Sequence, residues 1–230
     1  MSIVAILVDG GFFHRRATYL WGDADPKQRA NELCAYCKRH LTSHDHLYRI
    51  FYYDCPPSEK KVYHPLLKRQ IDLGRSDEYR KMTEFQTCMK KKRKVALRMG
   101  HLLDIGVYYT LRPDVVKKIC HGKVSIDDLT ESDFVLNISQ KGVDMKIGVD
   151  IASMAYKKQV NKMILISGDS DFVPAAKLAR REGIDFVLDP MGAAIRDDLS
   201  EHIDGLVSPR FVPRKNEIIK EAAEESENDE

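Results

Sequence analysis

Short, nearly unbroken apolar runs recur along the chain and predict buried strands. The clearest are residues 2–9 (SIVAILVD), 162–167 (KMILIS) and 184–189 (IDFVLD). Runs of this length, rich in β-branched residues and followed by polar turns, are typical of parallel strands covered on both faces of a sheet. Residues 46–57 (HLYRIFYYDCPP) predict a further strand, which two prolines end.

Weaker signals predict three more extended pieces. Residues 104–113 (DIGVYYTLRP) are interpreted as a third strand, 133–140 (DFVLNISQ) as a short extended piece, and 204–209 (DGLVSP) as a last edge strand. Each run is shorter or more polar than the clear strands, as an edge position allows.

Between the strands, apolar residues recur at helical spacing. Residues 10–22, 26–41, 142–159 and 171–183 all show this pattern, and the last of them ends at a glycine suited to a left-handed cap. Strands alternating with helices predict an α/β fold: a doubly wound, mostly parallel sheet flanked by helices.

The polar stretch 58–100 is interpreted as a helical basic insertion in the alternation of strands and helices. We therefore expect one domain over residues 1–212 that contains the insertion, and an acidic, disordered tail over 213–230. From Glu217 onward the tail holds seven acids and one lysine, so it carries −6; because the whole chain carries +2, residues 1–216 carry +8. A basic body favours polyanionic partners such as nucleic acid.

Composition excludes several other classes of protein. No apolar run approaches the ~20 residues of a membrane-spanning helix, and the first residues lack the basic start of a signal peptide, so we expect a cytoplasmic protein that does not bind membranes. Five irregularly spaced cysteines favour reduced thiols over a disulfide framework. The pattern leaves open whether the chain forms a homodimer.

Aspartates follow the predicted strands. Asp9 ends the first strand, and Asp169 and Asp171 come directly after residues 162–167. Asp144 lies in the first turn of the helix that leads back to that strand. Because the carboxyl ends of parallel strands share one edge of the sheet, where ligands bind at the switch point, we expect all four carboxylates there.

Four carboxylates in one cleft repel one another unless a cation lies among them. Hard oxygen ligands suit Mg²⁺ or Mn²⁺, which can lower the pKa of bound water and stabilise charge on a phosphodiester. Taken singly, Asp9 is equally well a strand terminator, Asp169 a turn former and Asp171 a helix cap; only their convergence favours metal binding. Asp150, six positions after Asp144 on the same helix, is expected to make a supporting hydrogen bond.

The motifs ILVDGGFF, KGVDMKIGVDIASMAY and ILISGDSDFVPAAKLARREGIDFVL resemble the NYN (LabA-like) domain of the PIN-like nuclease superfamily, over nearly all of residues 3–212. The resemblance implies a PIN-like fold and a metal-dependent endoribonuclease that hydrolyses RNA. It implies Asp9, Asp144, Asp169 and Asp171 as catalytic metal ligands. Many members carry asparagine three residues after the first aspartate, whereas this sequence has Phe12. We expect this departure to affect catalytic activity more than the fold.

Basic and polar residues near these motifs are candidate substrate contacts. Residues 89–100 (MKKKRKVALRMG) contain six cations and no acid, so phosphate binding there would be salt-sensitive and sequence-independent; a nuclear-localisation run and a solvated helix face are the alternatives. The RNA, single-stranded or structured, is expected to contact Lys91, Lys92, Arg93, Arg98 and Phe12. Supporting roles are expected for Lys141, Lys146, Ser167 and Ser170, for which surface, turn and cap positions are the alternatives.

Two other functions remain open. A non-catalytic RNA- or protein-binding module would keep the acidic pocket without turnover. A haloacid-dehalogenase-like phosphatase is less favoured, because that chemistry needs a second acid two residues after the first aspartate and Gly11 stands there. Cys34, Cys37, His40 and His44 lie along one predicted helix, so buried thiols are favoured over a zinc site.

Overall fold

The computed structural model describes residues 1–102, 106–138 and 140–213. Contacts divide the chain into two compact units, the first built from residues 1–54, 84–100 and the chain from 142 onward, the second from 55–83 and 101–141. Most of the expected acidic tail lies outside the described residues.

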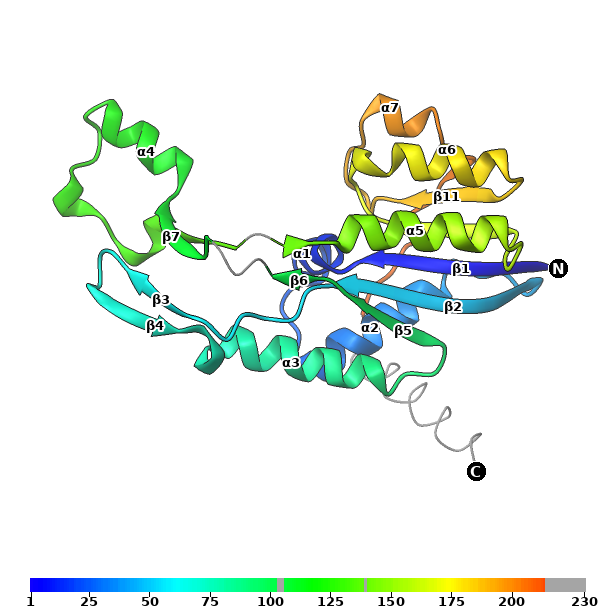
Figure 1. Ribbon diagram of the computed structural model, residues 1–230, viewed down its shortest axis with the longest axis horizontal. Coiled ribbons are helices and arrows are strands. Elements are labelled where there is room, and N and C mark those ends of the chain that lie inside the picture. Colours follow the sequence, from blue (N-terminus) through cyan, green and yellow to red (C-terminus); the bar gives the residue numbers. More distant parts are fainter. Residues whose placement is uncertain (103–105, 139, 214–230) are drawn as a thin grey trace. The chain divides into compact units, whose positions relative to one another are not determined.

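The first unit is built on a six-stranded sheet in which every pairing is parallel (Figure 1). In spatial order the strands are β12 (Gly205–Leu206), β11 (Asp185–Asp189), β10 (Lys162–Ile166), β1 (Ser2–Asp9), β2 (Asp45–Asp54) and β5 (Val95–Met99). Successive strands extend outward from β1 in both directions. The order therefore reverses between β1 and β10, which makes their carboxyl ends the switch point of the sheet.

Helices cover both faces of this sheet. Their bounds are α1 (Gly10–Trp21), α2 (Pro26–Lys38), α3 (Asp77–Lys90), α5 (Val143–Tyr156), α6 (Val173–Arg181), α7 (Asp197–Ser200) and the 3₁₀ turn η4 (Ser170–Phe172). Figure 1 shows α5 and α6 on one face, with α1 and α2 on the other. This arrangement confirms the predicted α/β fold with a mostly parallel sheet flanked by helices.

Alternation along the strands builds two apolar layers. Leu7, Phe51 and Leu165 point toward α5 and α6 and join one buried cluster with Ile151 and Ala176. Their neighbours along the strands are equally buried and face the other helices. Burial of a side chain of this size stabilises the fold by about 1.5–3 kcal/mol, so the central strands are held from both sides.

The second unit consists of short antiparallel pairs and one helix. Its elements are β3 (Lys61–His64) with β4 (Arg69–Asp72), β6 (His101–Leu102) with β9 (Gln140–Lys141), β7 (Tyr108–Leu111) with β8 (Phe134–Asn137), α4 (Pro113–Cys120), and the 3₁₀ turns η1 (Leu73–Arg75), η2 (Ile126–Asp128) and η3 (Glu131–Asp133). The buried His64 ring packs against Tyr109 and Phe134, which ties the hairpin to the β7–β8 pair.

Two details differ from the sequence expectations. The stretch 58–100 holds α3 but also β3, β4 and β5, so it is not simply helical. The strand expected at 104–113 is β7, which pairs with β8 outside the main sheet, and the outer strand of the main sheet is β5 instead. An edge strand has one neighbour and only half-buried residues, so its apolar pattern is weak.

Two further observations concern the whole described chain. Its described part holds all five cysteines and contains no disulfide. Among the described helices, none combines the length and apolar character that a bilayer crossing requires.

Close packing beneath the start of α1 makes Gly10 sensitive to substitution. A Cβ there would lie 2.5 Å from Tyr52 Oη and 2.8 Å from the carbonyl oxygen of Tyr53. Gly10→Ala should therefore lower the free energy of unfolding by ~1–3 kcal/mol, the usual cost of overpacking, as measured by urea denaturation. Gly148→Ala is the matched control: open space surrounds Gly148 in α5, so alanine there should be neutral or stabilise by up to ~1 kcal/mol. Equal effects of the two changes would contradict the packing described.

Candidate functional site

Asp9 joins β1 to α1 and is held from two sides. Its Oδ1 caps α1 by accepting a hydrogen bond from the Phe12 N–H at 3.1 Å, and its Oδ2 accepts one from Ser167 Oγ at 3.2 Å. Ser167 is fully buried and directly follows β10, whose Ile166 pairs with Val8. Strand register thus places Asp9 at the switch point, where the Ser167 hydroxyl fixes its carboxylate.

Asp169 and Asp171 lie in the turn that leads from β10 into α6. The Asp169 N–H donates to Ser167 Oγ at 3.3 Å, and Asp169 Oδ1 accepts from the Asp171 N–H at 3.0 Å. Asp169 thereby caps η4, and Ser170 is the first residue of that turn. Both carboxylates are exposed to solvent. The cap role foreseen for Asp171 belongs to Asp169.

Asp144 reaches the same region from α5. This helix leads into β10 and packs against α6 and η4, so its first turn lies at the carboxyl edge of the sheet. Burial, followed by the charges of Asp9, Asp169 and Asp171, raises the pKa of Asp144. The four predicted carboxylates are therefore close enough to interact electrostatically.

The environment of Asp9 also disfavours its ionised form. Burial is the main cause of its raised pKa, and the charge of Asp169 adds to it. Hydrogen bonds from the Phe12 N–H and Ser167, together with the positive charge of Arg15, act in the opposite direction. A cation among these oxygens would offset both the desolvation and the mutual repulsion.

The acidic residues fit a hydrated divalent ion by their chemistry. As they stand, no three Asp, Glu, His or Cys side chains in the described ranges are grouped closely enough to hold a metal ion. Mg²⁺, however, prefers oxygen ligands, keeps several of its waters and commonly takes only one or two carboxylates directly. The donor set therefore suits an ion that the remaining carboxylates contact through water.

Arg15 is a candidate site residue that sequence reasoning missed. A Cβ on Gly11 would lie 3.6 Å from both Arg15 Nη1 and Asp9 Oδ1, so the guanidinium and the carboxylate both lie close to that glycine. Arg15 is exposed and lies in the second turn of α1. A cation six residues after the first aspartate was the available signal, and it suits a phosphate oxygen near the acids.

Phe12, the third residue after Asp9, lies in the first turn of α1. A Cβ on Gly168 would lie 2.8 Å from Phe12 Cε2, so the half-buried ring lies directly over this glycine. Phe12 therefore covers the loop that holds Asp169 with an apolar surface. It offers no polar side-chain contact to a metal or phosphate.

Asp150 and Arg98 form a separate structural pair. Asp150 Oδ2 accepts a hydrogen bond from Tyr53 Oη at 2.8 Å and pairs with Arg98 Nε at 2.9 Å. The Arg98 guanidinium also lies over the ring of Phe51, 5.1 Å from its centroid. These contacts link α5 to strands β2 and β5 of the sheet. They involve the side chain of Arg98, which we expected to contact RNA.

The other predicted basic residues are spread over both units. Lys91, Lys92 and Arg93 form the turn that precedes β5, which places them toward the amino ends of the parallel strands. Lys141 belongs to the second unit, and Lys146 is exposed on α5. A nucleic-acid role for these residues stays a prediction, but Lys91, Lys92 and Arg93 do not stand beside the carboxylates.

A buried polar network beside the site was not predicted. Asp189, the last residue of β11, is fully buried and accepts hydrogen bonds from Tyr36 Oη (2.6 Å), the Met191 N–H (2.7 Å) and Ser208 Oγ (2.6 Å). His40 Nε2 lies 2.8 Å from the same carboxylate. His40 is thus committed to Asp189. The network joins α2 to the loop that follows β11.

Comparison with known proteins assigns the family. The model of the NYN domain matches residues 4–203. The chain belongs to the NYN domain family. This NYN domain is accordingly a member of the PIN-like nuclease superfamily, as its motifs indicated.

Other comparisons add little. A search of curated proteins found no significant match. Among solved structures, a protein of unknown function from Vibrio parahaemolyticus is similar with a TM-score of 0.44 and 16% sequence identity, over 90% of this chain and 91% of that one.

Repulsion within the acidic group predicts a pH-dependent effect of Asp144→Asn. The folded-state pKa of Asp144 lies above its ordinary value of 3.8, so the ionised carboxylate opposes folding at neutral pH and this opposition fades as pH falls through the raised pKa. In EDTA, Asp144→Asn should therefore be more stable than the wild type near pH 7, by a margin that shrinks toward about pH 4. Chemical denaturation at several pH values measures this difference.

Asp23→Asn, in an exposed loop of the same unit, controls for the loss of one negative charge. A margin for Asp144→Asn that grew on acidification would show that the carboxylates do not repel one another as described.

Proposed function

We propose that this NYN-domain protein is a metal-dependent endoribonuclease that hydrolyses RNA phosphodiester bonds at Asp9, Asp144, Asp169 and Asp171. The observation that carries the proposal is the electrostatic coupling of these four residues, which come from three separate segments of the chain. Membership of the NYN family supports the reaction class. The proposed cofactor is Mg²⁺ or Mn²⁺, and the proposed location is the cytoplasm.

The proposed roles follow from how each side chain is held. Asp9, fixed by Ser167 and the Phe12 N–H, would be the most rigid ligand, while the exposed Asp144, Asp169 and Asp171 would complete the site directly or through water. When bound, the ion would supply an acidified water and stabilise negative charge on the phosphodiester. The oxygen of that water would bond to phosphorus as the water gives up a proton, the bond to the leaving ribose oxygen would break, and that oxygen would take up a proton.

Arg15 and Phe12 would act on the substrate in this proposal. Arg15, beside Asp9, is placed to contact a non-bridging phosphate oxygen. Phe12 covers Gly168 with an aromatic face on which a base can stack. The phosphate would then be oriented by one cation and one aromatic ring of α1.

A non-catalytic RNA- or protein-binding module is the second candidate. The observation that favours it is that the described acids do not form a ready three-ligand site. The replacement of a polar residue by Phe12 points the same way. The module would keep the acidic pocket without turnover.

Loss of one carboxylate tests the nuclease proposal. Incubation of the protein with single-stranded and structured RNA should give cleavage with Mn²⁺ or Mg²⁺ and none with EDTA. Asp169→Asn keeps the side-chain shape but removes the ligand charge, so it should lower the cleavage rate by more than the ~10- to 100-fold that loss of an outer-shell partner costs. Gel analysis of end-labelled RNA measures the rate.

Asp114→Asn, on exposed α4 in the second unit, is the matched control and should cleave like the wild type. RNA binding without cleavage in any metal would replace the nuclease with the binding module. Release of phosphate from small esters would instead indicate a phosphatase.

A further inference from the structure

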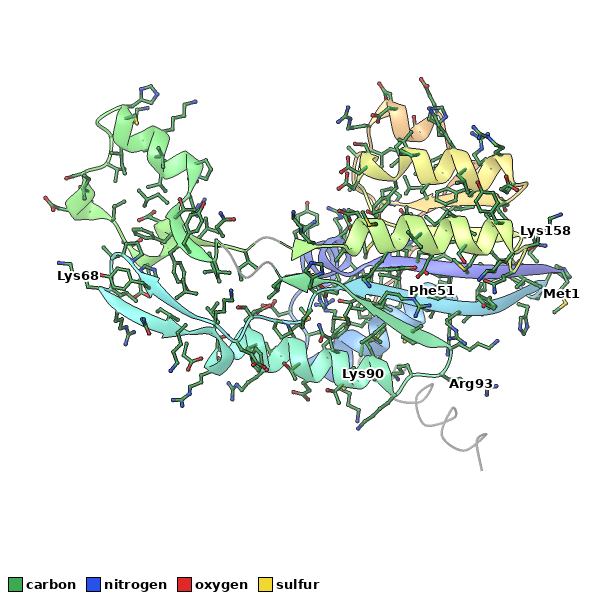
Figure 2. All side chains as sticks on the ribbon, in the orientation of Figure 1. Met1, Phe51, Lys68, Lys90, Arg93 and Lys158 are labelled. Atoms are coloured by element: carbon green, nitrogen blue, oxygen red, sulfur yellow. The ribbon has the colours of Figure 1, made fainter. Side chains whose placement is uncertain are left out.

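A group of cations lies at the other edge of the sheet from the acids. We name it the amino-edge patch; it consists of Arg49, Lys90, Lys91, Lys92, Arg93 and Lys94. Five of these residues form the end of α3 and the turn into β5, and Arg49 comes from the neighbouring strand β2. Figure 2 shows Arg93 toward the end of the sheet where Met1 lies.

Hydrogen bonds make the patch continuous. The Ile50 N–H donates to the carbonyl oxygen of Lys94 at 2.8 Å, which places Arg49 beside Lys94. Lys94 Nζ donates to the carbonyl oxygen of Leu47 at 2.6 Å, so this side chain points along β2 toward its amino end. The Arg49 guanidinium lies over the ring of Tyr48, 6.0 Å from its centroid. Lys90, Lys91 and Arg93 are exposed.

The charge of the patch exceeds what local structure requires. Cations at the end of α3 complement the helix dipole, but that end carries only about −0.5 charge. Asp45, the acid at the start of β2, accepts hydrogen bonds from the N–H and hydroxyl of Thr42 and adds one negative charge. Arg49, Lys90, Lys91, Lys92 and Lys94 carry five positive charges, which exceed the about −0.5 of the helix end together with the single charge of Asp45.

The patch is separated from the acids by a distance that the strand register fixes. Arg98 pairs with Tyr53, and Tyr53 pairs with Asp9, so these three residues are level across the sheet. Lys94 lies four residues before Arg98, or about 13 Å along the strand, and two strand spacings from β1, or about 10 Å across. The patch thus begins about 16 Å from Asp9, the combination of these two displacements.

We propose that the amino-edge patch binds the phosphate backbone of RNA at a distance from the acidic residues, so that the protein selects RNA chains long enough to reach both. This proposal rests on the proposed ribonuclease function. A span of about 16 Å corresponds to about five nucleotides at ~3.4 Å of helical rise each, or to about three nucleotides of a fully extended strand at roughly 6 Å each. Of the large exposed hydrophobic residues, none lies between residues 84 and 99, a fully described segment. The α3–β5 turn therefore lacks an apolar anchor of its own, of the kind that membrane insertion or a protein hot spot needs.

Neutralisation of the turn tests the patch. Binding of an RNA of about 30 nucleotides and of a dinucleotide, which at roughly 6 Å per extended nucleotide is too short to span the distance, is measured by fluorescence anisotropy in EDTA, which prevents cleavage. The triple variant Lys91→Gln/Lys92→Gln/Arg93→Gln should bind the long RNA at least about tenfold more weakly. Its slope of log affinity against log salt should be shallower by about 2, because each lost phosphate contact removes ~0.7. The preference of the wild type for long over short RNA should shrink in the variant.

A second triple variant, Lys117→Gln/Lys118→Gln/Lys123→Gln, removes the same charge from exposed positions on and just after α4. It should keep the affinity and salt slope of the wild type. Thermal denaturation checks that both variants fold. Equal weakening by both variants would show a net-charge effect and overturn the proposal.

The remaining outcomes separate this proposal from the ribonuclease function. Wild-type RNA affinity in the first variant overturns the anchor, even if the protein cleaves RNA. Reduced affinity in that variant, from a protein that cuts no RNA with any metal, supports the anchor and overturns the nuclease. Loss of binding to phosphatidylserine vesicles with RNA affinity unchanged would identify an anionic membrane as the partner instead.

Discussion

Electrostatic repulsion among four carboxylates is the constraint on which the candidate site depends. Asp144 lies near Asp9, Asp169 and Asp171, and burial together with their charges raises its pKa. Two of these acids also cap backbone N–H groups, since Asp9 accepts from Phe12 and Asp169 from Asp171. Hydrogen bonds from these N–H groups favour the ionised carboxylates, whereas the charges of the neighbouring acids disfavour them. Positive charge placed among the four carboxylates would offset this repulsion.

The sheet is rigid enough to maintain this unfavourable arrangement. Ile6, Leu7 and Ile164 are buried at the centre, and helices cover both faces. Breaking the contacts of one such side chain costs about 1.5–3 kcal/mol, so modest repulsion at the strand ends cannot pull β1 and β10 apart. The Ser167 hydroxyl links the two strand ends by donating to Asp9 while it accepts from the Asp169 N–H. Core packing therefore fixes backbone positions that the carboxylates alone would not keep.

Sequence pattern revealed the centre of this molecule better than its edges. β1 and β10 were predicted almost residue for residue, because strands buried on both faces must be apolar at nearly every position. Val95–Met99 was missed because an edge strand is half-buried and this one follows five consecutive cations. The approach of the four aspartates followed from strand direction. The Asp189 network did not, because its partners Tyr36, His40 and Ser208 depend on how α2 and the last segment pack.

The distribution of charge bears on how an anionic chain would approach this protein. Acids gather at the carboxyl edge of the sheet, and the cations of the α3–β5 turn lie toward the amino edge. Without a bound cation the carboxylates repel phosphate, so long-range attraction must come from elsewhere on the surface. Arg15 adds one positive charge beside Asp9, which is too little to offset four carboxylates. Encounter at the basic edge, followed by capture at a metal-loaded acidic edge, is the sequence of events that this distribution favours.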